Sequence, residues 1–124
     1  MDLAIHFTYN ANIAMRNPLS GEFEQLVLLS ILRLGEGAYA LPIRHELDAR
    51  GHRSISRGAL YTALERLEAK GLAASELGEP LRQRGGRARR YYTVTADGLE
   101  ALRHSRRTLE RFWQGLDSPL KGNL

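Results

Sequence analysis

One stretch decides how this chain folds: residues 56–72, which read SRGALYTALERLEAKGL. Three of its leucines, Leu60, Leu64 and Leu67, recur at the three- and four-residue spacing of a single helix face. The opening serine can cap the helix, and Gly71 stands where a glycine ends one. The stretch therefore predicts a helix with a buried leucine face and an exposed opposite face.

Two helices are predicted upstream of this leucine helix. Ser20 can cap a helix over residues 21–34, which carries apolar residues at helical spacing and stops at Gly35. Pro42 fits the first turn of a second helix, because the N–H that proline lacks has no partner there, and Gly51 closes that helix. A link of only a few residues separates the second helix from the leucine helix. Two short helices joined so closely indicate a helix-turn-helix.

A β-hairpin is predicted next. Residues 72–77 can form a first strand, which Gly78, Glu79 and Pro80 should break. Residues 90–95 are aromatic and β-branched, so they are expected to form a second and better strand. A long basic tip that contains two glycines joins the two strands, as in the wing of a winged helix.

A last helix completes the pattern. Thr95 or Asp97 can cap it, and it is expected to run to about Gly115. The predicted fold is therefore mainly α with a small β-hairpin: a winged helix-turn-helix followed by a C-terminal dimerisation helix. The expected units are an N-terminal arm or short helix, a DNA-binding domain, and a dimerisation helix with its tail, over residues 1–20, 21–95 and 96–124.

Length and composition exclude several classes of protein. A chain of 124 residues suits one hydrophobic core, and the lack of cysteine excludes disulfides and cysteine zinc sites. No run approaches the ~20 apolar residues of a membrane span, and the N-terminus does not look like a signal peptide, so we expect a cytoplasmic protein. The four histidines show no metal-ligand spacing, and the sequence has neither a G-x-S-x-G nor a P-loop motif. We therefore expect no enzyme activity, no cofactor and no metal.

Basic residues are concentrated in one segment. The chain carries 18 Lys and Arg against 14 Asp and Glu, a net charge of +4. Residues 82–107 alone hold eight Arg against Asp97 and Glu100, a net charge of +6. Five of these arginines lie in or beside the predicted wing: Arg82, Arg84, Arg87, Arg89 and Arg90. Beside a helix-turn-helix we expect them to hold DNA phosphates or enter a minor groove; the alternative is a solvated loop that keeps the protein soluble.

The start of the leucine helix presents polar residues on its exposed face. The N-terminal residues of a recognition helix are those that reach base edges, and Arg57 suits a contact with guanine. The predicted DNA-reading residues are Ser56, Arg57, Gly58, Tyr61 and Thr62. Two alternatives stay open at this point: Ser56 caps the helix, with or without a DNA contact, and Tyr61 lies half-buried with its hydroxyl exposed.

The last helix carries leucines every seven residues, with two aromatic residues beside them, which is typical of a seam for another helix. Because the winged-helix core is expected to be complete by Val94, we predict that this seam pairs with a second copy of the chain. The predicted homodimer interface consists of Leu102, Leu109, Phe112, Trp113 and Leu116. The alternative is that the seam packs on its own domain.

The indole of Trp113 beside Phe112 raises the further hypothesis of a small aromatic effector bound near the dimer interface. A flat aromatic ligand can stack on an indole. The alternative is a tryptophan that only fills the core.

Two blocks of the sequence resemble a known family. Residues 58–72, GALYTALERLEAKGL, look like the recognition-helix block of the PadR-like transcriptional regulators. Residues 86–98, GRARRYYTVTADG, look like the wing strand of that family and the entry to its C-terminal helix, and residues 21–34 are similar to its first helix. The chain departs from the family pattern at Ala40, where glycine is usual, and at Ala73, where isoleucine or valine is usual.

This resemblance implies a homodimeric repressor of bacterial type that binds double-stranded DNA at a pseudo-palindromic promoter site. It also implies a response to a small aromatic compound or drug, or regulation of a neighbouring operon. The single short C-terminal helix resembles the compact branch of the family. The residues alone leave an alternative open, a winged-helix protein-interaction module that does not bind DNA.

Overall fold

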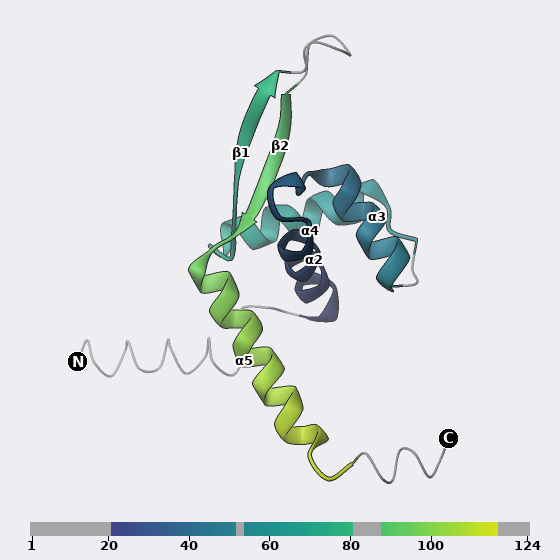
Figure 1. The fold of residues 1–124 in the computed structure, drawn as a ribbon, viewed down its shortest axis with the longest axis vertical. Coiled ribbons are helices and arrows are strands. Elements are labelled where there is room, and N and C mark those ends of the chain that lie inside the picture. The colour runs from purple at the N-terminus through teal and green to yellow at the C-terminus, as the bar shows by residue number, and fades with distance from the viewer. Residues whose placement is uncertain (1–20, 52–53, 81–87, 117–124) are drawn as a thin grey trace, which may run out of the picture.

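The computed structural model describes residues 21–51, 54–80 and 88–116, so the arm predicted for residues 1–20 lies outside the described residues. The elements follow the predicted order of helices, hairpin and helix (Figure 1). They are α2 (Gly21–Leu34), a short 3-10 helix η1 (Gly35–Gly37), α3 (Ala40–Gly51), α4 (Arg57–Ala69), β1 (Ala73–Pro80), β2 (Ala88–Val94) and α5 (Ala96–Trp113).

The helix ends lie where local chemistry predicts them. Ser56 caps α4, since its Oγ accepts a hydrogen bond from the backbone N–H of Ala59 at 3.1 Å. Gly71 follows α4 with φ +75°, a left-handed conformation that favours glycine. Thr95, rather than Asp97, caps α5, and its Oγ1 accepts from the N–H of Gly98 at 3.0 Å.

The hydrophobic core lies where α2, α3 and α4 meet beneath the hairpin (Figure 1). The leucine face of α4 is buried as its spacing predicts, and α3 contributes the buried Ile43 and Leu47. The largest fully buried side chains are Val27, Leu28, Ile43, Leu60, Leu64 and Leu67. Among the described helices and strands, none covers the opposite face of α4.

The first strand is longer than the sequence predicts. The expectation that Gly78, Glu79 and Pro80 break it is wrong, because β1 continues to Pro80 and pairs antiparallel with β2. The pairing shifts register between Leu77 and Pro80. A side chain at Gly78 would place its Cβ 2.8 Å from Cε2 of Tyr91. The lack of a side chain at Gly78 therefore leaves room for the Tyr91 ring to pack across the strand. The hairpin extends away from the helices as a wing (Figure 1).

The first half of α5 belongs to the core of the domain, which corrects the expectation that the core is complete at Val94. Ala101 and Ser105 are buried, and Leu102 packs against the core cluster. A Cβ at Gly98 would lie 2.1 Å from the carbonyl oxygen of Leu72, so the helix begins in close contact with the backbone before β1. The second half of α5 extends beyond the domain (Figure 1).

Across the part of the chain that the structure describes, no helix is both long enough and apolar enough to span a membrane.

Candidate nucleic-acid interface

The exposed face of α4 brings the predicted reading residues together. Tyr61 is 45% exposed, and Ser56, Arg57, Gly58 and Thr62 are exposed as well. Ser56 therefore serves as the cap while its side chain stays at the surface. At 45% exposure Tyr61 lies about half buried, which agrees with the alternative given for this residue. The five positions all lie at the cap or in the first two turns of α4, and all are exposed.

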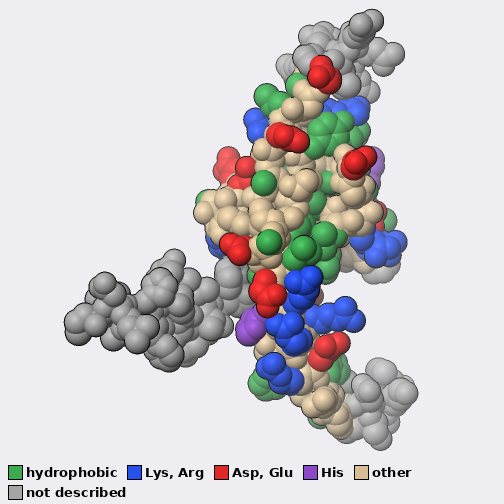
Figure 2. All heavy atoms as spheres, turned by 60° about the vertical axis from the view of Figure 1, so that its left-hand side comes forward, with side chains coloured by type: hydrophobic (Ala, Val, Ile, Leu, Met, Phe, Trp, Pro, Cys, Tyr) green, Lys and Arg blue, Asp and Glu red, His purple; other side chains and the backbone are tan. Residues whose placement is uncertain are grey.

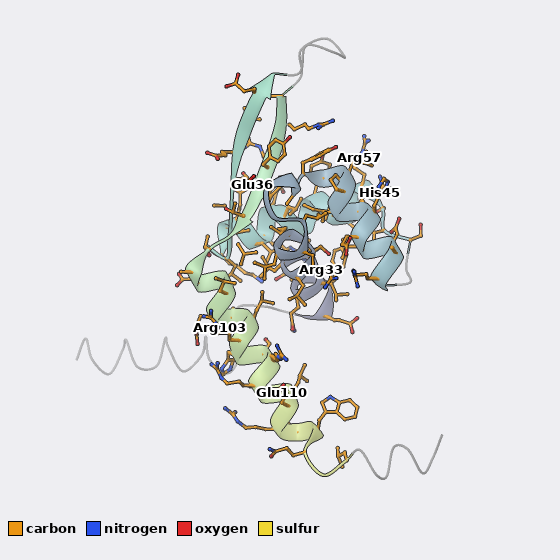
Figure 3. The ribbon with its side chains drawn as sticks, in the orientation of Figure 1. Arg33, Glu36, His45, Arg57, Arg103 and Glu110 are labelled. Atoms are coloured by element: carbon orange, nitrogen blue, oxygen red, sulfur yellow. The ribbon has the colours of Figure 1, made fainter. Side chains whose placement is uncertain are left out.

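Arg57 and the exposed end of α5 lie on different sides of the molecule. In Figure 3, Arg57 lies at the upper end of the helical body, toward the hairpin, while Arg103 and Glu110 lie on α5 well below it. A ligand that covers the start of α4 can therefore also approach the wing without meeting the end of α5.

The turn before α4 is held by two side chains of α3. The backbone N–H of Ile55 donates to Oδ1 of Asp48 at 3.0 Å, and the carbonyl oxygen of Ile55 accepts from Nε of Arg44 at 3.1 Å. Both hydrogen bonds are partly buried. Because Ile55 immediately precedes the cap of α4, these bonds fix where the exposed face of α4 begins.

Strand β2 of the wing is attached to the segment between α2 and α3. The backbone N–H of Tyr92 donates to the carbonyl oxygen of Ala38 at 2.8 Å. The guanidinium carbon of Arg89 lies 4.2 Å from the ring centroid of Tyr39, and Tyr39 meets the ring of Tyr91 edge to face at 5.6 Å. Hydrogen bonding, cation–π contact and aromatic contact thus set the angle between hairpin and helices.

The second described wing arginine is also engaged within the chain. Nη1 of Arg90 donates to Oγ of Ser75 at 3.1 Å, and that hydroxyl donates to Oε2 of Glu68 on α4 at 2.9 Å. Both hydrogen bonds are exposed, and the side chains of Arg90 and Glu68 are accessible to a ligand.

Burial raises the pKa of the neighbouring Tyr92 phenol above its ordinary value, and the Glu68 carboxylate raises it further.

Arg82, Arg84 and Arg87 of the predicted wing set lie outside the described residues. The two arginines that the structure describes, Arg89 and Arg90, lie near the start of β2, the end of the strand next to the tip, where Arg90 pairs with Leu77. Both have a partner in the chain, although stacking on an aromatic ring leaves the edge of a guanidinium open to further hydrogen bonds.

The end of α5 exposes apolar side chains, in contrast to its first half. Leu109 is 53% exposed, Phe112 75% and Trp113 50%, and Leu116 is exposed too, whereas Leu102 is partly covered by the core. The idea that Trp113 fills the core of its own domain is therefore wrong. Figure 2 shows basic side chains gathered over the same helix. They are Arg103, Arg106, Arg107 and Arg111, three of which form ion pairs with Glu100 or Glu110.

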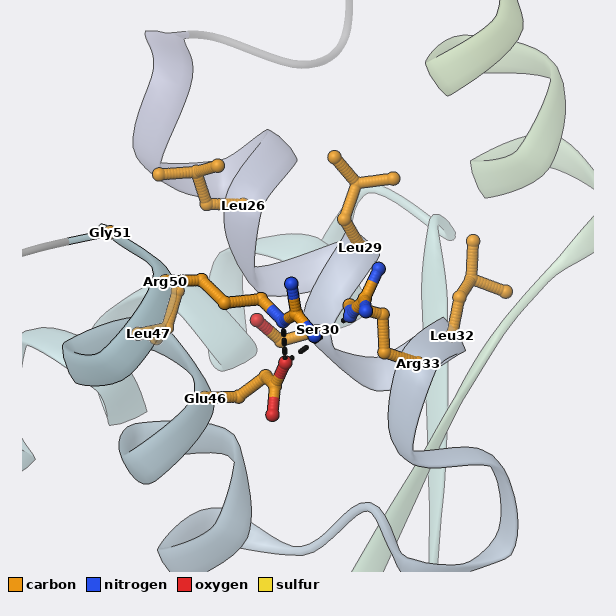
Figure 4. A pocket seen from close by; sticks show the side chains of 9 residues that line it. All are labelled: Leu26, Leu29, Ser30, Leu32, Arg33, Glu46, Leu47, Arg50 and Gly51. Atoms are coloured by element: carbon orange, nitrogen blue, oxygen red, sulfur yellow. Dashed lines mark hydrogen bonds and ion pairs between the residues drawn. The ribbon is translucent and has the colours of Figure 1, made fainter.

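An open, largely apolar pocket lies between α2 and α3 on the surface of the domain (Figure 4). At its rim, Oε1 of Glu46 accepts from Nε of Arg33 at 3.2 Å and also from Nε of Arg50. Leu29 and Leu32 add exposed apolar surface from α2. The carboxylate ties α2 to α3 at a site that does not include the turn before α4.

No group of three or more histidine, aspartate or glutamate side chains gathers as a metal site within residues 21–51, 54–80 and 88–116. Over the same ranges, no buried side-chain nitrogen or oxygen lacks a hydrogen-bond partner.

Sequence reasoning did not identify Arg44, Asp48 and Tyr39 as parts of this interface. The first two lie four residues apart on α3, each one position after a buried residue, Ile43 or Leu47. That spacing indicates that the two side chains share a face of the helix. Their partners are backbone atoms of Ile55, and because every residue has these atoms, the sequence does not reveal the hydrogen bonds. The partner of Tyr39 lies 50 residues further along the chain, at Arg89.

Comparison with known proteins agrees with this architecture. The family model described as "Transcriptional regulator PadR-like family" matches residues 28–104. The transcriptional regulator Rv3488 from Mycobacterium tuberculosis is 47% identical over 68 residues, which cover 55% of this chain and 59% of that protein. The aligned part thus spans less than two thirds of that relative.

Solved structures extend the comparison to the fold. A PadR family transcriptional regulator from Eggerthella lenta is 27% identical with a TM-score of 0.59, covering 95% of this chain and 96% of that chain. A PadR family regulator from Clostridium difficile, at 24% identity, has the same fold with a TM-score of 0.63, covering 80% of this chain and 99% of the other. With a family model matching more than half of its residues, this chain belongs to the PadR-like family of transcriptional regulators.

Proposed function

We propose that this chain binds double-stranded DNA with sequence preference and represses transcription as a homodimer on a two-fold symmetric promoter site. The observation that carries the proposal is the polar, exposed face at the start of α4, opposite a fully buried leucine face. Among the described residues, no hydrogen bond or ion pair holds the side chain of Arg57. A guanidinium held out from a helix N-terminus has the geometry that reads guanine in the major groove.

The wing supplies the second contact with DNA. Arg89 and Arg90 lie near the tip-side end of β2, and the sequence adds Arg82, Arg84 and Arg87 just before that strand. These cations would hold phosphates without reading sequence, so they raise affinity for every duplex alike. The attachment of the hairpin to the helices lets the wing and α4 engage one duplex together.

The homodimer is supported by the exposed apolar end of α5. Phe112, Trp113 and Leu109 are each at least half exposed, which is costly in water for side chains of this size. Pairing α5 with a second copy would cover them and double the DNA contacts. Two recognition helices related by a two-fold axis then read half-sites about one helical turn apart. Repression is the sign of regulation that the family resemblance implies.

An effector site at the dimer interface is a further part of the proposal. Trp113 is half exposed and lies next to Phe112 in the sequence, so a planar aromatic compound could stack there once two copies meet. Titration of the dimer with small aromatic compounds, followed through Trp113 fluorescence, tests this. Quenching that saturates supports the site, and no response to any compound removes the reason for it.

The experiment that tests DNA binding is fluorescence anisotropy with the duplex from upstream of the protein's own gene, repeated over a salt series. A dimer that neutralises about six phosphates should lose affinity roughly 1000-fold between about 50 and 200 mM salt. Affinity that stays constant over this range contradicts the phosphate contacts. A complete lack of binding to any duplex favours the alternative of a protein-interaction module, whose surface has no use for the wing arginines.

A further inference from the structure

We propose that Arg44 and Asp48 are positioning residues for base recognition: they act on DNA through Ile55, whose backbone they hold, and so place the start of α4. The inference rests on the proposed DNA binding and adds to it the residues that decide how well the wild-type protein distinguishes its site from other DNA.

The two side chains satisfy both backbone polar groups of a single residue. Asp48 accepts from the Ile55 N–H at 3.0 Å, and Arg44 donates to the Ile55 carbonyl oxygen at 3.1 Å. Ile55 precedes the helix, so it has no helical or strand partner for these groups. A backbone group that is partly buried must find a partner, and here α3 provides both.

The two hydrogen bonds affect the start of α4 because Ile55 lies next to it. Ile55 is adjacent to Ser56, which caps α4 with an extended backbone at φ −72° and ψ 153°, and two residues from Arg57. The side chain of Ile55 packs against the core while its backbone is held from α3. A shift of the turn would therefore move Arg57 relative to a base edge, and hydrogen bonds to bases tolerate little displacement.

Contacts with phosphates depend much less on this placement. The wing lies on β1 and β2 and is attached to the helices through Tyr39, Ala38 and the hydrogen bond from Ser75 to Glu68. The last of these lies at the far end of α4, so none includes the turn. Long arginine side chains can follow a phosphate over a small displacement. Loosening the turn should consequently lower the affinity for the preferred site more than the affinity for random DNA, a difference that a loss of folded protein would not produce.

The alternative explanation is that the two bonds only stabilise the helix-turn-helix. Four variants of the full chain separate the two explanations, and α3 offers a matched control for each change of charge. Asp48→Ala is compared with Glu46→Ala, which removes the same charge from the same helix. The Glu46 carboxylate contacts Arg33 and Arg50 and not the turn before α4. Arg44→Ala is compared in the same way with Arg50→Ala.

The measurement is the ratio of affinities for the duplex that wild-type protein selects and for a random duplex, at one salt concentration and well below the melting temperature of each variant. We expect Asp48→Ala and Arg44→Ala to lower this ratio about tenfold, the effect of one lost hydrogen bond. Both controls should leave the ratio within about twofold of wild type. Asp48→Asn, whose amide oxygen can still accept from Ile55, should restore most of the ratio.

Amide hydrogen exchange gives a readout that does not use DNA. The Ile55 N–H should exchange slowly in wild-type protein and in Asp48→Asn, and faster in Asp48→Ala. The inference is overturned if Asp48→Ala weakens binding to both duplexes equally, or if it behaves as Glu46→Ala does. If wild-type protein distinguishes no duplex from any other, the proposed function itself fails and this inference with it.

Discussion

The guanidinium of Arg89 lies over the aromatic ring of Tyr39 at 4.2 Å, and this contact joins the wing to the helices from positions 50 residues apart. Charge patterning assigns Arg89 to a phosphate-binding group, but the structure shows that the same side chain also connects the hairpin to the helical part of the domain. A guanidinium that stacks on an aromatic ring keeps the N–H groups at its edge free to donate hydrogen bonds. Arg89 can therefore contact Tyr39 and a DNA phosphate at the same time.

The first prediction concerns that contact. Replacing Tyr39 with leucine removes the ring that Arg89 covers and the edge-to-face contact with Tyr91. We expect the free energy of unfolding to fall by about 1 kcal/mol. DNA affinity should fall for all sequences alike, because the wing is displaced while α4 is not. Tyr39→Phe keeps the ring and serves as the control. Chemical denaturation and anisotropy measure the two effects, and a Tyr39→Leu protein as stable as wild type contradicts the contact.

The second prediction concerns the start of α5. Gly98→Ala would place a methyl group 2.1 Å from the carbonyl oxygen of Leu72, a distance that forces the helix away from the hairpin. We expect a loss of about 2 kcal/mol or more in the free energy of unfolding, the cost of an overpacked site. Gly58→Ala is the matched control for stability, because a Cβ there meets no atom within 4 Å. Equal melting temperatures for the two variants would show that α5 does not pack as described.

The third prediction concerns pH. Burial raises the pKa of Tyr92 in the folded protein above its ordinary value. Above the ordinary pKa of a phenol, the unfolded chain loses this proton while the folded chain keeps it, so the free energy of unfolding falls as the pH rises. Below that pKa the phenol is neutral in both states and adds no pH dependence. Tyr92→Phe lacks the group and should lose stability less steeply at alkaline pH.

Denaturation of wild-type protein and Tyr92→Phe at several pH values between about 8 and 11 measures this difference. The two curves should run parallel at the lower end and diverge at the upper end. Parallel curves over the whole range would mean that the Tyr92 phenol titrates alike in the folded and unfolded chains.

The fourth prediction concerns assembly. Replacing both Phe112 and Trp113 with serine removes the most exposed apolar surface of α5 without touching the buried Ala101 and Ser105. We expect wild-type protein to sediment as a dimer at micromolar concentration and the double variant as a folded monomer. Arg111→Ser, an exposed change on the same turn, should leave the dimer intact. A double variant that remains dimeric would place the interface elsewhere on the chain.

Local chemistry made the helix ends predictable from sequence. The cap at Ser56 and the left-handed glycine at Gly71 depend on residues within a few positions, which the sequence displays directly. The exposed face of α4 follows from its leucine spacing for the same reason. The order of the helices and the hairpin was predictable from the two blocks that resemble the PadR-like family, residues 58–72 and 86–98. Both blocks lie within residues 28–104, which the family model matches.

Contacts between distant residues were not predictable in this way. The strand continues through Gly78 because the ring of Tyr91 occupies the space beside it, and a glycine next to a proline indicates a break when read alone. The first half of α5 joins the core through Ala101 and Ser105, which are too small to mark a buried face by hydrophobicity. The bonds from α3 to Ile55 involve backbone atoms, which every residue carries.

The most direct test of the central claim is selection of bound duplexes from a random DNA pool by wild-type protein and by Arg57→Ala, with Arg66→Ala, an exposed arginine in the last turn of α4, as the matched control. Wild-type protein and the control should enrich the same two-fold symmetric site with half-sites about one helical turn apart. Arg57→Ala should lose the preference for guanine at one position of each half-site, worth about 1–3 kcal/mol. An unenriched pool, or an identical site selected by Arg57→Ala, would contradict the assignment of the α4 face as the surface that reads DNA.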